Sequence, residues 1–169
     1  MKTLYIVRHA KSSWDDPDLS DFDRPLSARG KRDAPRMGKR IKEKDFTPDC
    51  VISSPARRAH STAKRICKVL GFDKNKIKTD RGLYHASEES ILSIVQDIKN
   101  KYATVLIFGH NPGLTDFVNL LMHEETGYFI ANVPTCGVAA FSFDVDSWKD
   151  VQWKKGKVLF FDYPKSKDD

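Results

Sequence analysis

The chain has 169 residues, of which 40% are hydrophobic and 31% charged, with a formal net charge of +6. This length fits one domain with a sizeable core, and the composition excludes a disordered protein. The apolar run from Leu4 to Val7 is too short for a signal-peptide core, and no stretch approaches a membrane span. Three widely spaced cysteines are expected to be reduced and mostly buried, as in a cytoplasmic protein (Cys50, Cys67 and Cys136).

The first predicted element is a strand over residues 3–9, followed by an acidic and then a basic segment. Residues 15–23 contain five aspartates and no basic residue, whereas residues 24–44 contain nine Lys or Arg against Asp33 and Glu43. A helix is expected over 27–44, where Gly30 and Gly38 weaken it and Pro35 should kink it.

The basic segment 24–44 can be read in three ways. It is a solvated helix face, a positive field that draws anionic substrates toward a nearby site, or a nucleic-acid surface. The last reading lacks interleaved aromatic residues and any known binding motif. We therefore do not expect nucleic acid as a partner.

Strands and helices alternate through the rest of the chain. Further strands are expected over residues 49–53, 77–79, 104–109, 137–144 and 157–163. In the helix after the second strand, Ser54 is the expected N-cap, Pro55 suits the first turn, and Gly71 follows the end. Ser87 is expected to cap another helix, and a third begins after Pro112.

This alternation predicts the α/β class. We expect a three-layer α/β/α arrangement around a mainly parallel central sheet. The last two strands have only an irregular link between them, so they are expected to pair directly as an antiparallel edge. A single domain over residues 1–164 is predicted, with residues 165–169 as a frayed C-terminal tail.

Two histidines each end an apolar strand. His9 follows the run Tyr5 to Arg8, and His110 follows Val105 to Gly109. In an open α/β sheet the carboxyl ends of the strands meet at one edge, where ligands collect. The segment SSPARRA (53–59) is a third strand end that leads into a helix. Two imidazoles and two guanidiniums at one edge would suit a phosphoryl dianion.

Each of these side chains has a chemical role in such a site. A neutral His9 can attack phosphorus and carry the phosphoryl group covalently. Arg8 can donate to the phosphoryl oxygens, provided that the strand ends or bends so that it shares a side with His9. His110 immediately precedes a helix and can donate to a phosphoryl oxygen.

Arg57 and Arg58 compete for the second guanidinium role, and helical geometry separates them. Arg57 lies on an entirely polar stripe that faces water (Arg57, Ser61, Lys64 and Lys68). Arg58 borders the buried face of the same helix. Arg58 is therefore the residue that we expect to reach the site.

Three motifs in this order resemble the histidine phosphatase superfamily, which also holds the cofactor-dependent phosphoglycerate mutases. They are RHAKSSW (8–14), SPARRAHSTA (54–63) and GHNPGL (109–114), and they most resemble the SixA-like phosphohistidine phosphatase branch. The resemblance covers roughly residues 1–145. It implies a phosphoglycerate mutase-like fold and phosphohistidine in proteins as the substrate. It also implies a phosphate pocket that includes Arg8, Arg58, His110 and the backbone N–H of Asn111.

The proton donor is where the sequence departs from the wider family. Many members carry a Glu or Asp two positions beyond a Leu after the third strand, where this chain has His85. His85 is a candidate acid or substrate-orienting residue, or has no role. Glu88 and Glu89 are accounted for as acids at a helix start. The flap from Lys11 to Pro25 is expected to border the mouth of the site.

No cluster of His, Cys or carboxylates has metal-ligand spacing, and the chain has no Gly-rich nucleotide loop. We therefore expect a metal-independent hydrolase without a cofactor, acting on a phosphorylated protein and away from membranes. Inorganic phosphate or sulfate should fill its pocket. Two alternatives remain: a small-molecule phosphomonoesterase on the same fold, and a non-catalytic phosphate- or phosphoprotein-binding module.

Overall fold

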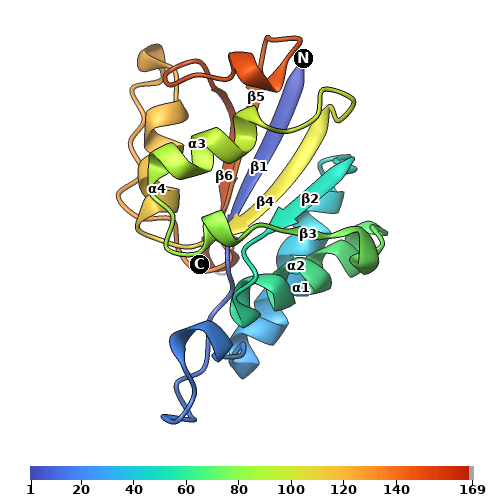
Figure 1. Ribbon diagram of the computed structural model, residues 1–169, viewed down its shortest axis with the longest axis vertical. Helices are drawn as coiled ribbons and strands as arrows, with labels where there is room; N and C mark the ends of the chain where they lie inside the picture. The colour runs from blue at the N-terminus through green and yellow to red at the C-terminus, as the bar shows by residue number, and fades with distance from the viewer. Residues whose placement is uncertain (168–169) are drawn as a thin grey trace.

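The computed structural model describes residues 1–167 and is built around one six-stranded sheet (Figure 1). Its strands are β1 (Lys2–Arg8), β2 (Cys50–Ser53), β3 (Lys78–Thr79), β4 (Thr104–Gly109), β5 (Val138–Phe143) and β6 (Lys157–Asp162). Their order across the sheet is β3-β2-β4-β1-β5-β6. All six predicted strands are present, and each bound lies within one residue of its expected position.

The strand directions match the expected mainly parallel sheet. β3, β2, β4 and β1 run parallel, and β5 pairs antiparallel with both β1 and β6. The last two strands thus pair directly at one edge, as their short irregular link predicts. The reversed strand is β5, one place inside that edge, so β6 runs in the direction of β1 again.

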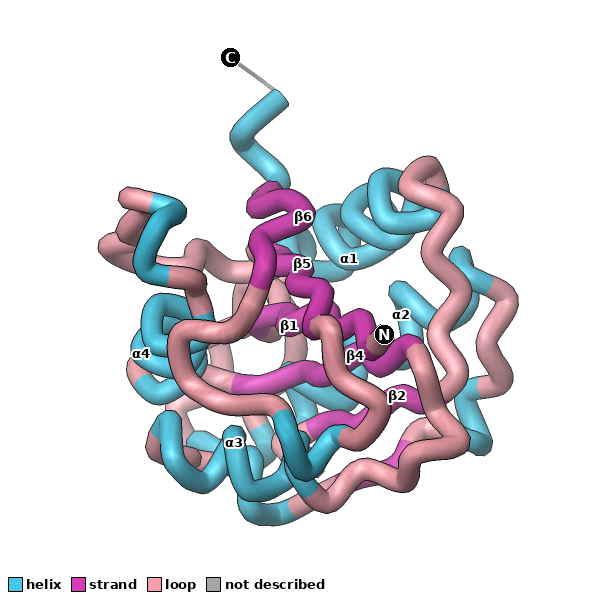
Figure 2. The backbone as a smooth tube through the Cα atoms, turned by 90° about the horizontal axis from the view of Figure 1, so that it is seen from above, coloured by secondary structure: helices cyan, strands magenta, loops and turns pink. Residues whose placement is uncertain are grey.

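Helices cover both faces of the sheet, which gives the expected three layers (Figure 2). The helices are α1 (Ala28–Lys42), α2 (Arg57–Leu70), α3 (Glu88–Gln96) and α4 (Gly113–Leu121). One core cluster packs Val51, Leu106 and Phe108 of the sheet against α1 and α2. A second packs Ile52 and Ile107 against α3 and α4. Strands buried on both faces need apolar residues at successive positions, which explains their continuous hydrophobic runs.

Most predicted helix ends are found, with one correction. The Ser87 side chain accepts from Ser90 N at the start of α3, and Gly71 ends α2 in the left-handed conformation. Ser54, however, does not cap α2. The helix begins only at Arg57, because Ser54 Oγ is instead engaged by Ala56 N and by a histidine at the end of β4.

The basic helix α1 forms without interruption at Pro35, with Ser27 as its N-cap. Arg40 of α1 donates to the carbonyl oxygens of Tyr163 and Pro164, which lie near the C-terminal end of the chain. A 3₁₀ helix occupies Pro164–Lys167, and residues 168–169 of the expected tail lie outside the described residues. The three cysteines are free and buried, as expected. Within the described chain, no helix combines the length and apolar character needed to cross a membrane.

Candidate active site

A cavity of about 340 Å³ opens where the carboxyl ends of β1, β2 and β4 meet. Six lining residues are those singled out from the sequence: Arg8, His9, Arg58, His85, His110 and Asn111. Another six line it as well: Lys11, Ser12, Trp14, Asp21, Arg24 and Thr135. Five of these come from the segment after β1, which projects beyond the sheet end as the dark blue loop of Figure 1. The expected flap therefore does border the mouth.

His9 follows the last residue of β1 and is buried, with its Nδ1 2.7 Å from the carbonyl oxygen of Ala10. A carbonyl oxygen can only accept, so Nδ1 carries the ring proton and Nε2 holds a lone pair. Burial lowers the pKa of His9 to about 4, against the opposing effect of the Ala10 hydrogen bond. The charges of Arg58 and Arg8 lower this pKa further. A lowered pKa favours the neutral form of His9 at physiological pH, with the lone pair on Nε2.

His110 lies beside His9, with 5.2 Å between the ring centroids. Its Nε2 is 2.7 Å from Ser54 Oγ, and that oxygen already accepts from Ala56 N at 3.2 Å. The hydroxyl hydrogen of Ser54 is free to donate to Nε2, and when it does so the ring proton of His110 lies on Nδ1. Burial, His9 and Arg58 lower the pKa of His110 to about 3. His110 is then a neutral donor.

The two guanidiniums enter the site from different elements. Arg8 Nη1 donates to the carbonyl oxygen of Val133 at 3.0 Å. Arg58 is buried at 5% exposure, whereas Arg57 is exposed, as helical phasing predicts. Arg58 Nη1 donates to the backbone oxygen of Asp21 at 2.6 Å, and Nη2 donates to its carboxylate at 3.0 Å.

Within the described residues, three buried side-chain polar atoms lack a hydrogen-bond partner: Arg8 Nε, Arg58 Nε and His110 Nδ1. All three belong to cavity-lining residues. Leaving a buried donor unpaired is costly, so such atoms usually mark a missing partner. Arg8 and Arg58 thus bring cationic N–H donors to the walls of this cavity, and an oxyanion has the acceptor oxygens that suit them.

Asp21 is a site residue that the sequence did not single out. Its carboxylate accepts from Arg58, from Arg24 Nη2 at 3.1 Å and from the Tyr84 hydroxyl at 2.7 Å. Burial would raise the pKa of Asp21, but these hydrogen bonds and the Arg58 charge outweigh it and hold the pKa well below its usual range. Asp21 is therefore an ionised carboxylate within the cationic mouth. In the sequence, Asp21 is marked only by its place near the end of the acidic run, just before Arg24.

Arg24, the first cation of the basic segment 24–44, also lines the cavity. It donates to Ser12 Oγ at 2.8 Å, and its guanidinium stacks 3.5 Å from the Trp14 ring centroid. Trp14 itself is 71% exposed. The flap thus adds a third guanidinium to the site.

His85 reaches the cavity from the loop before α3, with a backbone φ of 54° in the left-handed region. A packing constraint holds this loop in place. A Cβ on Gly113, the first residue of α4, would overlap the carbonyl oxygen of Ala86. Glu88 lies in the first turn of α3 and, like Glu89, does not line the cavity.

Asn111 lies between His110 and α4, and its side chain is fully engaged. Nδ2 donates to Asn132 Oδ1 and to the Val133 carbonyl, while Oδ1 accepts from the backbone and hydroxyl of Thr115. Only the backbone of Asn111 could therefore serve a ligand. In residues 1–167, no three His, Cys, Asp or Glu side chains group as metal ligands would.

Comparison with known proteins supplies the family context. The sequence pattern of the histidine phosphatase superfamily (branch 1) matches residues 4–87. An uncharacterized chloroplastic protein of Arabidopsis thaliana is 31% identical over 157 residues, covering 88% of this chain and 70% of that protein.

Two solved structures share the fold. The putative phosphohistidine phosphatase SixA from Agrobacterium tumefaciens superimposes with a TM-score of 0.78 at 25% identity, covering 96% of this chain and 98% of that one. The protein histidine phosphatase SixA complexed with tungstate gives a TM-score of 0.80 at 21% identity, covering 96% and 97%.

Proposed function

The chain belongs to the histidine phosphatase superfamily, and we propose that it removes phosphate from phosphohistidine in proteins through a phosphohistidine intermediate on His9. The observation that carries this proposal is the His9 tautomer. The Ala10 carbonyl holds the proton on Nδ1, so the Nε2 lone pair is available in a cavity whose lining residues Arg8, Arg58 and His110 each have one unpartnered buried nitrogen.

In the first step the Nε2 lone pair of His9 attacks phosphorus. The P–N bond to the substrate imidazole breaks, its electron pair stays on the substrate nitrogen, and that nitrogen takes a proton from solvent water. Arg8, Arg58 and His110 stabilise the charge that spreads over the phosphoryl oxygens.

In the second step water attacks the phosphorus bound to His9. The P–Nε2 bond breaks and its electron pair returns to Nε2, while water gives one proton to solvent. Inorganic phosphate leaves, and the site returns to its starting state. Both steps use the same donors, so one cavity suffices.

The charge state of Asp21 supports the choice of substrate. An alkoxide leaving group needs an acid, and Asp21, the one carboxylate among the described cavity-lining residues, is held ionised. Imidazole is a much better leaving group, because its nitrogen titrates near pH ~6.5. An ionised carboxylate also suits a leaving ring that carries positive charge. The described phosphohistidine phosphatases of the same fold, one of them with the oxyanion tungstate, agree with this assignment.

A small-molecule phosphomonoesterase is the second candidate, because His85 lines the cavity and could protonate an alcohol leaving group. A series of phosphoryl substrates with leaving groups of graded pKa distinguishes the two. We expect kcat/KM to fall steeply as the leaving group becomes more basic, with little change in His85→Ala. A shallow dependence that becomes steep in His85→Ala would instead identify the phosphomonoesterase, with His85 as its acid.

The intermediate is tested by labelling with a phosphorylated substrate. We expect acid-labile, base-stable label on the wild-type protein and none on His9→Ala. Binding of substrate without label or turnover would contradict the proposal and identify a binding module.

A further inference from the structure

The two helical layers of the molecule carry opposite charge. α1 and α2 together contain twelve Lys or Arg and one acid, Asp33, a formal charge of +11. The rest of the chain holds the other 17 of its 29 Lys and Arg and the other 22 of its 23 Asp and Glu, a formal charge of −5. α3 and α4, on the other face, contain three acids and no Lys or Arg. Positive charge is therefore concentrated on one side.

The charge of α2 is not balanced within the helix. α1 has Asp33, which pairs with Arg29 and Arg36, but the 14 residues of α2 include no acid. Lys68 follows Lys64 by four residues and Arg65 by three, so these like charges are neighbours on the helix surface and destabilise it. An anionic partner would remove this repulsion.

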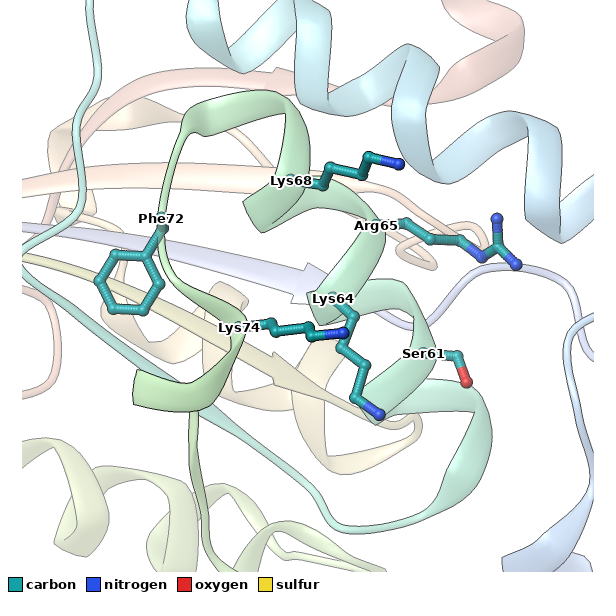
Figure 3. Close-up of a pocket in the computed structure, with 6 residues that line it drawn as sticks. All are labelled: Ser61, Lys64, Arg65, Lys68, Phe72 and Lys74. Carbon is teal, nitrogen blue, oxygen red and sulfur yellow. The ribbon is translucent and has the colours of Figure 1, made fainter.

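These cations border a hollow of about 500 Å³ on the outer side of α2, lined by Ser61, Lys64, Arg65, Lys68, Phe72 and Lys74 (Figure 3). In Figure 3 the side chains of Lys64 and Lys74 lie beside each other, and those of Arg65 and Lys68 extend toward α1. Within the described chain, none of the four forms an ion pair. The hollow thus offers four uncompensated charges.

The hollow is aligned with the active site through α2. This helix begins with exposed Arg57 and with Arg58, which enters the cavity. At a rise of about 1.5 Å per residue, Lys64 and Lys68 lie about 9 and 15 Å along the helix axis from Arg58. An extended peptide covers that distance in about three to five residues. The axial distance from Arg58 to these lysines is thus within the span of one short substrate segment.

We propose that this hollow docks an acidic segment of the protein substrate and so presents its phosphohistidine to His9, an inference that rests on the proposed function. The four cations complement the carboxylates of an acidic peptide. A nucleic acid would in addition need aromatic side chains on which its bases stack. Phe72, the one aromatic residue of the hollow, is half-buried against the core and provides no stacking platform for nucleic acid. The surface thereby selects the protein that carries the phosphohistidine, while the cavity selects the phosphoryl group.

The probes are synthetic peptides with a single histidine phosphorylated by phosphoramidate. One set carries Asp and Glu from about four residues before or after that histidine, and a matched set carries Ser and Gln there. We expect wild-type kcat/KM to be about tenfold or more higher for an acidic peptide than for its matched neutral one, mainly through KM. Raising the salt concentration should shrink this preference.

The variant Lys64→Glu/Lys68→Glu/Lys74→Glu should lose the preference and keep the wild-type rate on free phosphohistidine. The control is Lys99→Glu/Lys149→Glu/Lys155→Glu, which makes the same change in net charge at exposed positions outside α1 and α2. It should keep the preference. An equal loss in the control would show a general charge effect and overturn docking at this hollow.

Two further outcomes would also overturn the proposal. One is equal kcat/KM for acidic and neutral peptides. The other is tight binding of a short single-stranded RNA or of phosphatidylserine vesicles that only the α2 variant loses, without a peptide preference. If the wild type turns over none of the phosphohistidine substrates, the proposed function fails instead. Docking is then decided by direct binding of the unphosphorylated acidic peptide to wild type and variants.

Discussion

Asp21 holds Arg58 at both ends of its guanidinium, with the backbone oxygen on Nη1 at 2.6 Å and the carboxylate on Nη2 at 3.0 Å. The Nε of Arg58 is buried and unpaired. Asp21 therefore fixes the orientation in which the Arg58 guanidinium meets the cavity. A residue of the flap in this way orients a residue of α2 that lies 37 positions away.

Removing this carboxylate should loosen Arg58. We expect Asp21→Ala to lower kcat/KM for free phosphohistidine about 10- to 100-fold, the range for losing a partner that orients a binding group. Asp21→Asn keeps an acceptor oxygen and should recover part of the loss. Asp23→Ala is the control, since within the described flap its carboxylate accepts only from the Ser20 hydroxyl. Equal effects of Asp21→Ala and Asp23→Ala would contradict an orienting role.

Arg58 and Arg57 should differ sharply in steady-state kinetics. Arg58→Ala removes a buried donor and should cost about a hundredfold or more in kcat/KM for free phosphohistidine. Arg57→Ala changes an exposed side chain and should be nearly silent on the same substrate. The reverse order would mean that the second guanidinium of the site has been misassigned.

Ser54 should control the proton position on His110. Without the Ser54 hydroxyl, Nε2 loses its donor and the ring can exchange tautomers. We expect ¹⁵N NMR of the ring to show the Nδ1–H form in the wild type and a mixture in Ser54→Ala, with a fall in kcat. Ser53→Ala removes a neighbouring hydroxyl that bonds only the Ser54 carbonyl, and it should leave the tautomer unchanged. An unchanged spectrum in Ser54→Ala would show that Ser54 does not determine the tautomer of His110.

The buried histidines predict how stability depends on pH. The pKa of His9 is lowered to about 4 and that of His110 to about 3, whereas unfolded histidine titrates near pH ~6.5. Between these values the unfolded chain binds more protons, so the free energy of unfolding falls as the pH drops from about 6.5 toward 4. Asp21, with its lowered pKa, acts in a separate window below the ordinary Asp value near ~3.9.

Urea unfolding at neutral pH and at about pH 5 measures this effect. The loss of stability on acidification should be smaller in His110→Gln than in the wild type, because one depressed titration is gone. His123→Gln, at an exposed position, provides the control. A loss that is the same in all three proteins would place the responsible groups elsewhere.

Anion binding and metal dependence test the chemistry of the cavity together. Chelators should leave turnover unchanged. Vanadate, phosphate or sulfate should inhibit competitively by accepting from the unpaired donors of Arg8, Arg58 and His110. Vanadate should inhibit Arg58→Ala much more weakly. Loss of activity on chelation that a divalent ion restores would overturn the mechanism.

The sequence predicts the sheet well because strand burial leaves a strong periodic signal. Fully buried runs such as 105–109 are apolar throughout, and the side of α2 occupied by Arg58 follows from helical spacing. The same local patterns predict that His9 and His110 lie at one edge of the sheet, because each follows the end of a predicted strand. Positions that depend on regular elements are therefore readable without coordinates.

The contacts that complete the site are not readable in this way. Asp21 lies in an irregular flap without periodicity, and its partners Arg58 and Tyr84 are distant in the chain. Ser54 has the position of a helix cap, but the competing contact with His110 comes from 56 residues away. Local pattern favours the cap, and tertiary structure decides otherwise.

Gly113 influences the position of His85. It does not line the cavity, yet its missing side chain is what allows α4 to approach the backbone next to His85. A single added methyl group there would push that loop and re-aim His85 while leaving every cavity-lining residue in the chain. The shape of the outer rim of the cavity can thus be changed by exchanging a residue that does not itself line the cavity.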